Sequence, residues 1–289
     1  MKKPLIGFIG QGWIGKNYAD SFERRGFKTV RYSLEQLFIQ NRNRIKECGI
    51  VFIAVPTPTK PKKGSDSSVV EEALKLVGDG KVAIIKSTVL PGTTQSLQKK
   101  HPKKKIFYSP EFLSEATAKF DVENPFSNIA GVAKNTPAYR KIAKYINSII
   151  PKAPFNLICT STEAELIKYS HNISGYTQII LFNIIFDIAR KMNVRWDIIE
   201  QAIKADPFIS NRYSNPIHKK GRGAGGGCFI KDFEAFLQLY SQKLPKGKNN
   251  LIVLRSLRNK NLELLISSKK DIGLITGIYG NKILKKKKK

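Results

Sequence analysis

The stretch Pro4-Leu-Ile-Gly-Phe-Ile-Gly10-Gln-Gly-Trp-Ile-Gly15 decides the fold class of this chain. Its short apolar run predicts a strand, and the glycines that follow have the G-x-G-x-x-G spacing of a dinucleotide-binding turn. A helix-compatible segment then continues to Arg25. Strand, glycine turn and helix in this order let the backbone approach a pyrophosphate that rests at the helix N-terminus. The residues that we expect to contact the dinucleotide here are Gly10, Gly12, Trp13, Ile14 and Gly15.

Alternating strand and helix patterns continue to residue 158. They predict an α/β fold whose first domain, residues 1–158, is a doubly wound, mostly parallel sheet of the Rossmann type. The further predicted strands are 28–32, 50–55, 81–88, 106–109, 128–132 and 155–159. Helical patterns then cover 161–192, 197–205, 229–240 and 251–267, so residues 159–267 are expected to form an all-α domain built on a long central helix. Residues 268–289 are expected to hold a lone strand, Asp271–Gly277, and a lysine-rich tail.

The composition is typical of a globular protein, with 41% hydrophobic and 10% aromatic residues in a chain of 289. Three widely spaced cysteines argue for a reducing compartment and against a disulfide framework. The chain starts on a strand pattern without a signal peptide, and its most apolar window, 179–189, is too short to span a bilayer. We therefore expect a cytoplasmic protein with no membrane span.

The net charge of +29, from 51 basic and 22 acidic residues, attracts polyanions or phosphate-bearing small molecules. Lysines gather at 60–63, 99–105 and 285–289, but no stacking aromatic residues are interleaved with them. This pattern favours solvated surface charge over specific nucleic-acid binding. A basic polyanion-binding protein on the same scaffold is an alternative that the sequence leaves open.

Polar residues end several of the predicted strands, which is where an open α/β sheet places its ligand contacts. They are Ser33, Thr57 and Ser87-Thr88, with Val55-Pro56 forming the proline-containing strand end before Thr57. An NAD-binding unit usually has an acidic residue at the position of Ser33, to bind the ribose hydroxyls. The missing acid, with Arg24 and Arg31 nearby, weakens the case for NAD and leaves NADP open, so the expected cofactor is NAD with NADP possible. No metal site is expected.

Residues 221–232, Gly-Arg-Gly-Ala-Gly-Gly-Gly-Cys-Phe-Ile-Lys-Asp, combine a glycine-rich loop with a single cysteine. Glycine at this density indicates special backbone conformations or close approach to a ligand. The apolar run from Phe229 predicts a helix, so Cys228 would lie at its N-terminus, where the macrodipole favours a thiolate. Cys228 is therefore a candidate nucleophile, with Asp232 one turn further on the same face. The alternative is a flexible linker with an inert, buried cysteine.

Six stretches taken together resemble the motifs of the nucleotide-sugar dehydrogenases, the family of UDP-glucose 6-dehydrogenase and GDP-mannose 6-dehydrogenase. They follow the family order over roughly residues 4–265 and are Gly10–Gly15, Val55–Pro58, Lys86–Thr94, Ser109–Glu115, Ala164–Asn172 and Gly223–Asp232. The resemblance implies NAD(P)-dependent oxidation of the C6 alcohol of a nucleotide sugar, with UDP-glucose giving UDP-glucuronate as the favoured case. It also implies two hydride transfers through a cysteine thiohemiacetal and thioester, and a role in polysaccharide biosynthesis.

The resemblance assigns roles residue by residue. Cys228 would be the nucleophile, Lys168 and Asn172 would stabilise the alkoxide, and a further set would manage protons and water, namely Glu111, Asp232 and Thr88. Substrate contacts would come from Phe112, Leu113, Glu115, Lys168, Asn172, Arg212 and Gly225. Cofactor contacts beyond the glycine turn would come from Ser33, Val55, Pro56, Thr57, Ser87, Thr88 and Glu115.

The sequence departs from the family pattern in several places. Phe208 stands where an arginine is usual, Ala224 replaces a phenylalanine and Gly227 a serine. The chain is expected to be a truncated form without most of the family's third domain, Asp271–Gly277 resembling that domain's first strand. An alternative is therefore a degenerate, non-catalytic member that binds a dinucleotide or a partner subunit.

The predicted helix 161–192 carries apolar residues on more than one face and so needs cover on several sides. We expect a homodimer in which a second copy packs on this helix.

Overall fold

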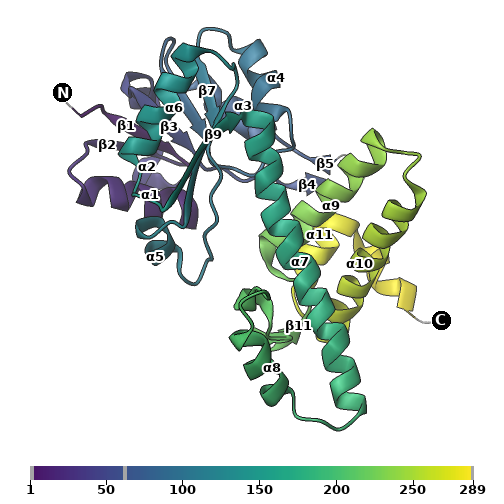
Figure 1. Cartoon of the computed structure of the whole chain (residues 1–289). Coiled ribbons are helices and arrows are strands. Elements are labelled where there is room, and N and C mark those ends of the chain that lie inside the picture. The colour runs from purple at the N-terminus through teal and green to yellow at the C-terminus, as the bar shows by residue number, and fades with distance from the viewer. Residues whose placement is uncertain (1–2, 61–63, 288–289) are drawn as a thin grey trace. The chain divides into compact units, whose positions relative to one another are not determined.

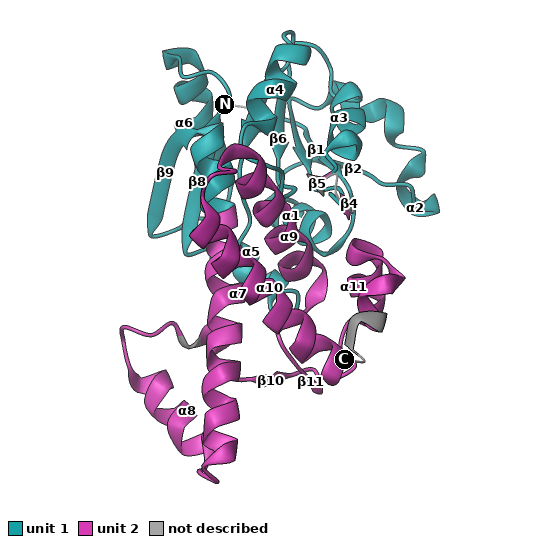
Figure 2. Ribbon diagram, turned by 90° about the vertical axis from the view of Figure 1, so that its right-hand side faces the viewer, with its two compact units in different colours: residues 1–58, 66–168 teal, residues 59–65, 169–289 magenta. Residues whose placement is uncertain are grey.

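The computed structural model describes residues 3–60 and 64–287, and the chain divides into two compact units (Figures 1 and 2). Unit 1 comprises Met1–Pro58 and Asp66–Lys168, and unit 2 comprises Thr59–Ser65 and Tyr169–Lys289. The division falls inside helix α7 (Ser161–Lys191), later than the boundary expected at residue 158. α7 begins with a reciprocal capping box, in which Thr160 and Glu163 satisfy each other's backbone N–H groups.

In the described part of unit 1, seven strands form one sheet in the order β2-β1-β3-β6-β7-β8-β9. The pairing of β7 with β8 is antiparallel and the other pairings are parallel. The strands are β1 (Ile6–Ile9), β2 (Thr29–Tyr32), β3 (Ile50–Ile53), β6 (Val82–Ile85), β7 (Lys105–Tyr108), β8 (Ser127–Val132) and β9 (Phe155–Thr160). The predicted α/β fold class is thereby confirmed.

Helices cover both faces of this sheet because successive side chains of a buried strand point to opposite sides. One core cluster joins alternate strand residues to α3 (Ser68–Lys75), α4 (Thr93–Lys100) and the start of α7. The other joins the intervening strand residues to α1 (Trp13–Arg24), α5 (Ala118–Glu123) and α6 (Pro137–Ile149). The short α2 (Gln36–Ile39) and the 3-10 helix η1 (Arg42–Glu47) follow β2.

The strand order reverses between β1 and β3, and ligands of open α/β sheets bind at the carboxyl ends of the strands at such a point. The glycine turn follows β1, and the predicted polar strand-end residues follow β2, β3 and β6. The topology therefore gathers these segments at one edge of unit 1.

Unit 2 is mainly helical, as expected. Its helices are the later part of α7, α8 (Trp196–Ala205), α9 (Gly226–Lys243), α10 (Lys248–Ser267) and α11 (Ile272–Tyr279), with 3-10 helices η2 (Asn211–Tyr213) and η3 (Asn281–Lys287). Two antiparallel strand pairs complete it, β4 (Thr59–Lys60) with β5 (Gly64–Ser65), and β10 (Ile217–His218) with β11 (Gly221–Arg222). The core joins α7 to α9 through the rings of Tyr176 and Phe233, which stack with centroids 3.9 Å apart.

The predicted strand at Asp271–Gly277 is wrong, because this segment forms helix α11. Ile275 and Ile278 lie one turn apart and pack against Ile230, Leu262 and Leu265. A short apolar run fits a strand or a helix equally well. The helix satisfies its own backbone hydrogen bonds, whereas a strand needs a pairing partner.

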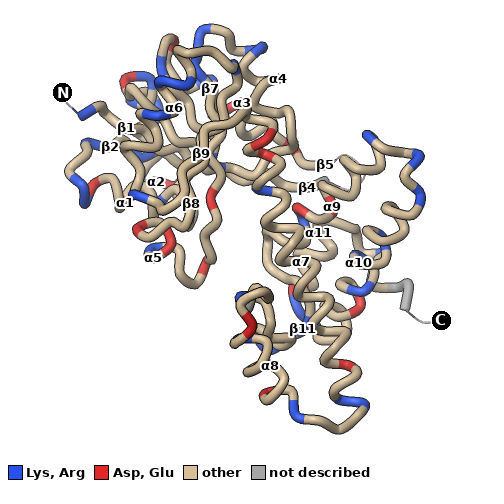
Figure 3. Tube along the Cα trace, viewed as in Figure 1, with Lys and Arg blue, Asp and Glu red and all other residues tan. Residues whose placement is uncertain are grey.

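Lysine and arginine are spread over the elements of both units (Figure 3). Of the predicted lysine clusters, 99–105 is described at the end of α4 and the start of β7. Residues 61–63 and 288–289 of the other two clusters lie outside the described residues. Within the described chain, none of the helices combines the length and the apolar character needed to cross a bilayer.

Candidate functional site

The glycine turn after β1 leaves room for a ligand only at its middle glycine. A Cβ at Gly10, which has φ +91°, would lie 2.2 Å from the carbonyl oxygen of Ala54, and one at Gly15 would lie 1.9 Å from that of Gly10. A Cβ at Gly12 would meet nothing within 4 Å. Gly12 also caps α1, whose first N–H groups favour an anion. This cradle fits the pyrophosphate of a dinucleotide, with Trp13 and Ile14 half-buried beside it.

The ends of β3 and β6 are tied together by side chains from the predicted set. The hydroxyl of Ser87 donates to the carbonyl of Val55 at 2.7 Å and accepts from its N–H at 2.9 Å. The hydroxyl of Thr57 donates to the carbonyl of Thr88 at 2.8 Å. Pro56, which stands between Val55 and Thr57 in the sequence, is exposed. The two loops that follow the strands are therefore fixed relative to each other.

Ser33 follows β2, where the ribose-binding acid is usual, and its hydroxyl accepts a hydrogen bond from the N–H of Glu35. The neighbouring Arg31 donates to Asp20 at 2.6 Å and to Glu23 at 2.5 Å and 2.9 Å. Arg24 is paired with Glu123. The 2′-phosphate of NADP would have to compete with these carboxylates for either arginine. The sequence did not reveal that both arginines are already paired.

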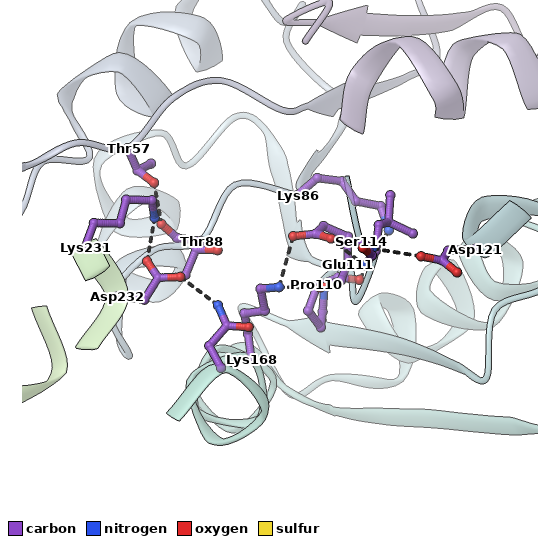
Figure 4. A network of polar contacts seen from close by, with 12 residues as sticks. Thr57, Lys86, Thr88, Pro110, Glu111, Ser114, Asp121, Lys168, Lys231 and Asp232 are labelled. Carbon is purple, nitrogen blue, oxygen red and sulfur yellow. Dashed lines mark hydrogen bonds and ion pairs between the residues drawn. The ribbon is translucent and has the colours of Figure 1, made fainter. Parts of the chain in front are cut away.

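Glu111 and Lys168 form a buried ion pair in unit 1, with 3% and 4% of their side chains exposed (Figure 4). The Nζ of Lys168 donates to Oε1 of Glu111 at 2.9 Å and to its carbonyl oxygen at 2.6 Å. The other carboxylate oxygen accepts from the N–H of Leu113 at 2.8 Å. Phe112 is also buried, and its ring centroid lies 5.6 Å from the ammonium. Glu111 and Lys168 are therefore buried charges and not solvated surface charges.

Lys86 and Glu165 are further buried, charged residues of unit 1 to which the sequence assigned no role. Lys86, directly after β6, lies within hydrogen-bonding distance of Ser109 and Tyr18. Glu165 on α7 accepts from the N–H groups of Gly92 and Thr94 at 2.6 Å and 2.8 Å, and so caps α4. Burial raises the pKa of Glu165 to about 7, against hydrogen bonds that favour its ionised form. Lys86 had a sequence signal, since it is a charged residue directly after an apolar run, whereas Glu165 stands among other charged residues and had none.

Asp232 and Asn172 meet inside unit 2, where they join α9 to α7. The amide of Asn172 donates to Oδ2 of Asp232 at 2.7 Å, and both side chains are buried. Lys231 donates to Oδ1 at 2.5 Å (Figure 4). Asp232 is therefore a buried carboxylate held by an amide and an ammonium. The contribution of Lys231 was missed from the sequence.

Cys228 lies in the first turn of α9, whose N-cap is Gly225, and it is exposed. The alternative of a buried cysteine in a linker is therefore wrong, whereas the nucleophilic role of Cys228 stays a prediction. Helix N-terminal N–H groups stabilise a thiolate at this position. The side chain of Asp271 accepts a hydrogen bond from the N–H of Gly226 at 2.7 Å, and a Cβ at Gly225 would lie 2.1 Å from that carboxylate. A larger residue at 225 would therefore displace the Asp271 side chain from this hydrogen bond.

The remaining predicted substrate contacts have mixed surroundings. Leu113 is half-buried, whereas Glu115 and Arg212 are exposed, the latter on η2. Thr88, Glu111 and Lys168 belong to unit 1, and Asn172, Cys228 and Asp232 belong to unit 2.

Comparisons with known proteins identify the family. The NAD binding domain of the UDP-glucose/GDP-mannose dehydrogenase family matches residues 28–148, and the central domain of the same family matches 162–261. A putative UDP-glucose 6-dehydrogenase, YtcA of Bacillus subtilis, is 32% identical over 76% of this chain and 52% of the relative. The UDP-glucose 6-dehydrogenase of Campylobacter jejuni is 30% identical over 85% of this chain and 64% of the relative. The chain thus spans between about half and two thirds of the length of these two relatives.

Solved structures show the same fold. A UDP-glucose dehydrogenase from Pyrobaculum islandicum superposes with a TM-score of 0.76 at 22% identity, covering 92% of this chain and 70% of that one. A UDP-D-ManNAc dehydrogenase from Pyrococcus horikoshii gives a TM-score of 0.73 at 20% identity, covering 90% and 68%. With both family domains matched in order and the dinucleotide turn in place, this chain belongs to the UDP-glucose/GDP-mannose dehydrogenase family.

Proposed function

We propose that this protein oxidises the C6 alcohol of UDP-glucose to the carboxylate of UDP-glucuronate, in the cytoplasm, as a step of polysaccharide biosynthesis. The observation that carries the proposal is the exposed Cys228 in the first turn of α9 in a chain of this family. A thiolate nucleophile allows the four-electron oxidation of an alcohol to a carboxylate, whereas simple alcohol dehydrogenation is a two-electron oxidation to the aldehyde. When bound, the dinucleotide accepts one hydride in each of the two oxidations.

The residues of this chain would divide the chemistry as follows. The alcohol loses a hydride from C6 and a proton from its hydroxyl to give an aldehyde. The sulfur of Cys228 then adds to the aldehyde carbon, forming a C–S bond and an alkoxide, which donors on Lys168 and Asn172 stabilise. Loss of a second hydride gives a thioester.

Water must then attack the thioester carbon, so that the C–S bond breaks, the carboxylate product is released and the thiolate of Cys228 is regenerated. Glu111 and Thr88 would position this water, and Asp232 would take up one of the two protons released, the other passing to solvent. The buried, hydrogen-bonded states of Glu111 and Asp232 support these roles because both carboxylates are held in one orientation. Overall, one alcohol, one water and two oxidised dinucleotides give one carboxylate, two reduced dinucleotides and three protons.

The second candidate is a member of the family that binds a dinucleotide or a partner without turnover. Phe208 favours it, because this side chain is 96% exposed where the resemblance places a substrate-binding arginine. Nicotinamide reduction, followed by absorbance over a panel of nucleotide sugars with NAD and with NADP, separates the two candidates. Turnover of UDP-glucose with two dinucleotides reduced per sugar supports the dehydrogenase. Dinucleotide binding without turnover of any nucleotide sugar supports the second candidate.

We further propose that the protein is a homodimer that packs through α7. Leu181, Ile184, Ile185 and Ile188 are exposed and follow helical i, i+3, i+4, i+7 spacing, so they form one apolar stripe. Contiguous exposed apolar surface of this kind marks an interaction site. A second copy of the same stripe is the matching surface in a two-fold assembly.

A further inference from the structure

Lys86 is a buried lysine that no part of the proposed mechanism uses. It directly follows β6, and only 3% of the residue is exposed. Among the described residues, its Nζ lies 3.1 Å from the hydroxyl of Ser109, 3.2 Å from that of Tyr18 and 3.4 Å from the carbonyl oxygen of Pro110. Figure 4 shows Lys86 beside the segment that carries Pro110 and Glu111.

The surroundings of Lys86 suit its charged form. An ammonium has three N–H donors, and Nζ can direct one to each of these oxygen atoms. The ammonium also lies 4.3 Å from the centroid of the Tyr18 ring, a favourable cation–π distance. A neutral amine has one donor fewer, so it cannot donate to all of these groups at once.

These contacts lead to the candidate catalytic pair. Ser109 and Pro110 immediately precede Glu111, whose carbonyl oxygen and carboxylate both bind Lys168. Tyr18 lies on α1, the helix that starts at the dinucleotide-binding turn. A single ammonium therefore connects the cofactor-binding helix to the backbone that presents Glu111.

We infer that Lys86 is a positioning residue for the proposed oxidation: its ammonium fixes the Ser109–Pro110 backbone, and thereby the Glu111–Lys168 pair, against helix α1. This inference rests on the proposed function for its effect on catalysis. Its structural part, the ordering of the segment 109–115, stands independently of any activity.

The positioning is expected to depend on pH. Burial lowers the pKa of Lys86 to about 7, while the Glu111 carboxylate raises it and the Lys168 ammonium lowers it further. Among the described residues, the Tyr18 hydroxyl is a further titratable group in contact with Lys86, and burial and Glu111 raise its pKa. Lys86 therefore loses its proton as the pH rises through neutrality, and the Ser109–Pro110 backbone is then no longer held in place.

The experiment replaces Lys86 with methionine, which keeps the chain length and removes the donors. Lys104→Met is the matched control, because Lys104 is another buried lysine of unit 1 that instead donates to the carbonyl of Val77. Lys86→Met is expected to lower kcat between about tenfold and a hundredfold, because the reacting groups are misplaced, and to leave KM nearly unchanged. It is also expected to remove the loss of wild-type activity above neutral pH, whereas Lys104→Met keeps the wild-type profile.

Two milder variants keep the inference testable if Lys86→Met does not fold. Tyr18→Phe and Ser109→Ala each remove one acceptor of the ammonium, so each should move the alkaline limb of the activity profile to lower pH by about one unit. Amide hydrogen exchange of a peptide covering residues 109–115 is read in parallel at one fixed pH. We expect faster exchange in Lys86→Met and in both milder variants, and wild-type exchange in Lys104→Met.

The outcomes separate this inference from the proposed function. If no nucleotide sugar is oxidised but the peptide 109–115 exchanges faster in the Lys86 variant, the proposed function fails and the structural part of the inference, the ordering of 109–115 by Lys86, stands. If UDP-glucose is oxidised and Lys86→Met keeps the wild-type kcat, pH profile and exchange, the positioning role is overturned.

Discussion

The strongest quantitative prediction concerns the ion pair between Lys168 and Glu111. Lys168→Met keeps most of the side-chain volume and removes the cation, which leaves the Glu111 carboxylate buried without its ammonium. The Nζ–Oε1 distance is 2.9 Å and both side chains are almost fully buried. The variant should therefore lose stability as well as turnover.

The magnitude follows from the geometry. At an effective dielectric constant of about 20, two unit charges at this separation attract by about 6 kcal/mol. Part of that attraction is offset by the cost of removing both charges from water. Removing one partner of a buried pair therefore costs about 3–5 kcal/mol, whereas removing both charges costs much less. We expect Lys168→Met to lose about 3–5 kcal/mol and the double variant Lys168→Met/Glu111→Gln to recover at least about half of that loss.

The assay is chemical denaturation at neutral pH of the wild type, both single variants and the double variant. Lys75→Met is the matched control, since Lys75 pairs with Glu72 at an exposed site. Loss of an exposed pair, which water and salt screen, should leave stability almost unchanged. A loss below about 1 kcal/mol for Lys168→Met, or a double variant that is as unstable as the sum of the single variants, would refute the argument that this pair is desolvated and coupled.

Three further predictions concern the nucleophile, a buried carboxyl and the assembly. Cys228→Ser should bind dinucleotide normally and form no carboxylate, because a serine hydroxyl is a far weaker nucleophile at neutral pH; carboxylate formation at the wild-type rate, measured by product analysis, would remove Cys228 from the mechanism. The folded-state pKa of Glu165 is raised to about 7 from its ordinary 4.5, so its contribution to stability is complete below about pH 4.5 and is lost as the pH rises through about 7. Relative to Glu165→Gln, the wild type should therefore lose about 3 kcal/mol of unfolding free energy over that interval, and a pH-independent difference in denaturation experiments would contradict this assignment. Ile188→Asp should convert a dimer to a monomer in sedimentation at high salt, whereas Ile252→Asp, at an equally exposed position on α10, should not; a monomeric wild type would exclude the homodimer.

The sequence by itself determined the fold class and the elements that carry local signals. The glycine spacing from Gly10 to Gly15 specified strand, turn and helix because Gly10 and Gly15 are required by backbone contacts within the same unit. The alternating apolar runs specified the sheet, since each buried strand carries its own pattern along the chain. The position of Cys228 in the first turn of a helix was predicted from the glycine-rich run and the apolar segment after it. Motif order over most of the chain also specified the family.

Only the tertiary structure decided which charged residues are buried and what they contact. Glu111 and Lys168 are 57 residues apart, and Lys86 is 68 residues from Tyr18, so no local pattern reports these pairs. The commitment of Arg31 to Asp20 and Glu23 was likewise hidden, because it depends on how α1 lies along β2. The segment after Asp271 was predicted as a strand because its apolar pattern fits a strand or a helix equally well. Packing against α9 and α10 stabilises the helix. Burial, hydrogen-bond partners and the resulting pKa shifts arise from contacts between distant segments, and a sequence pattern describes only the chain's own neighbourhood.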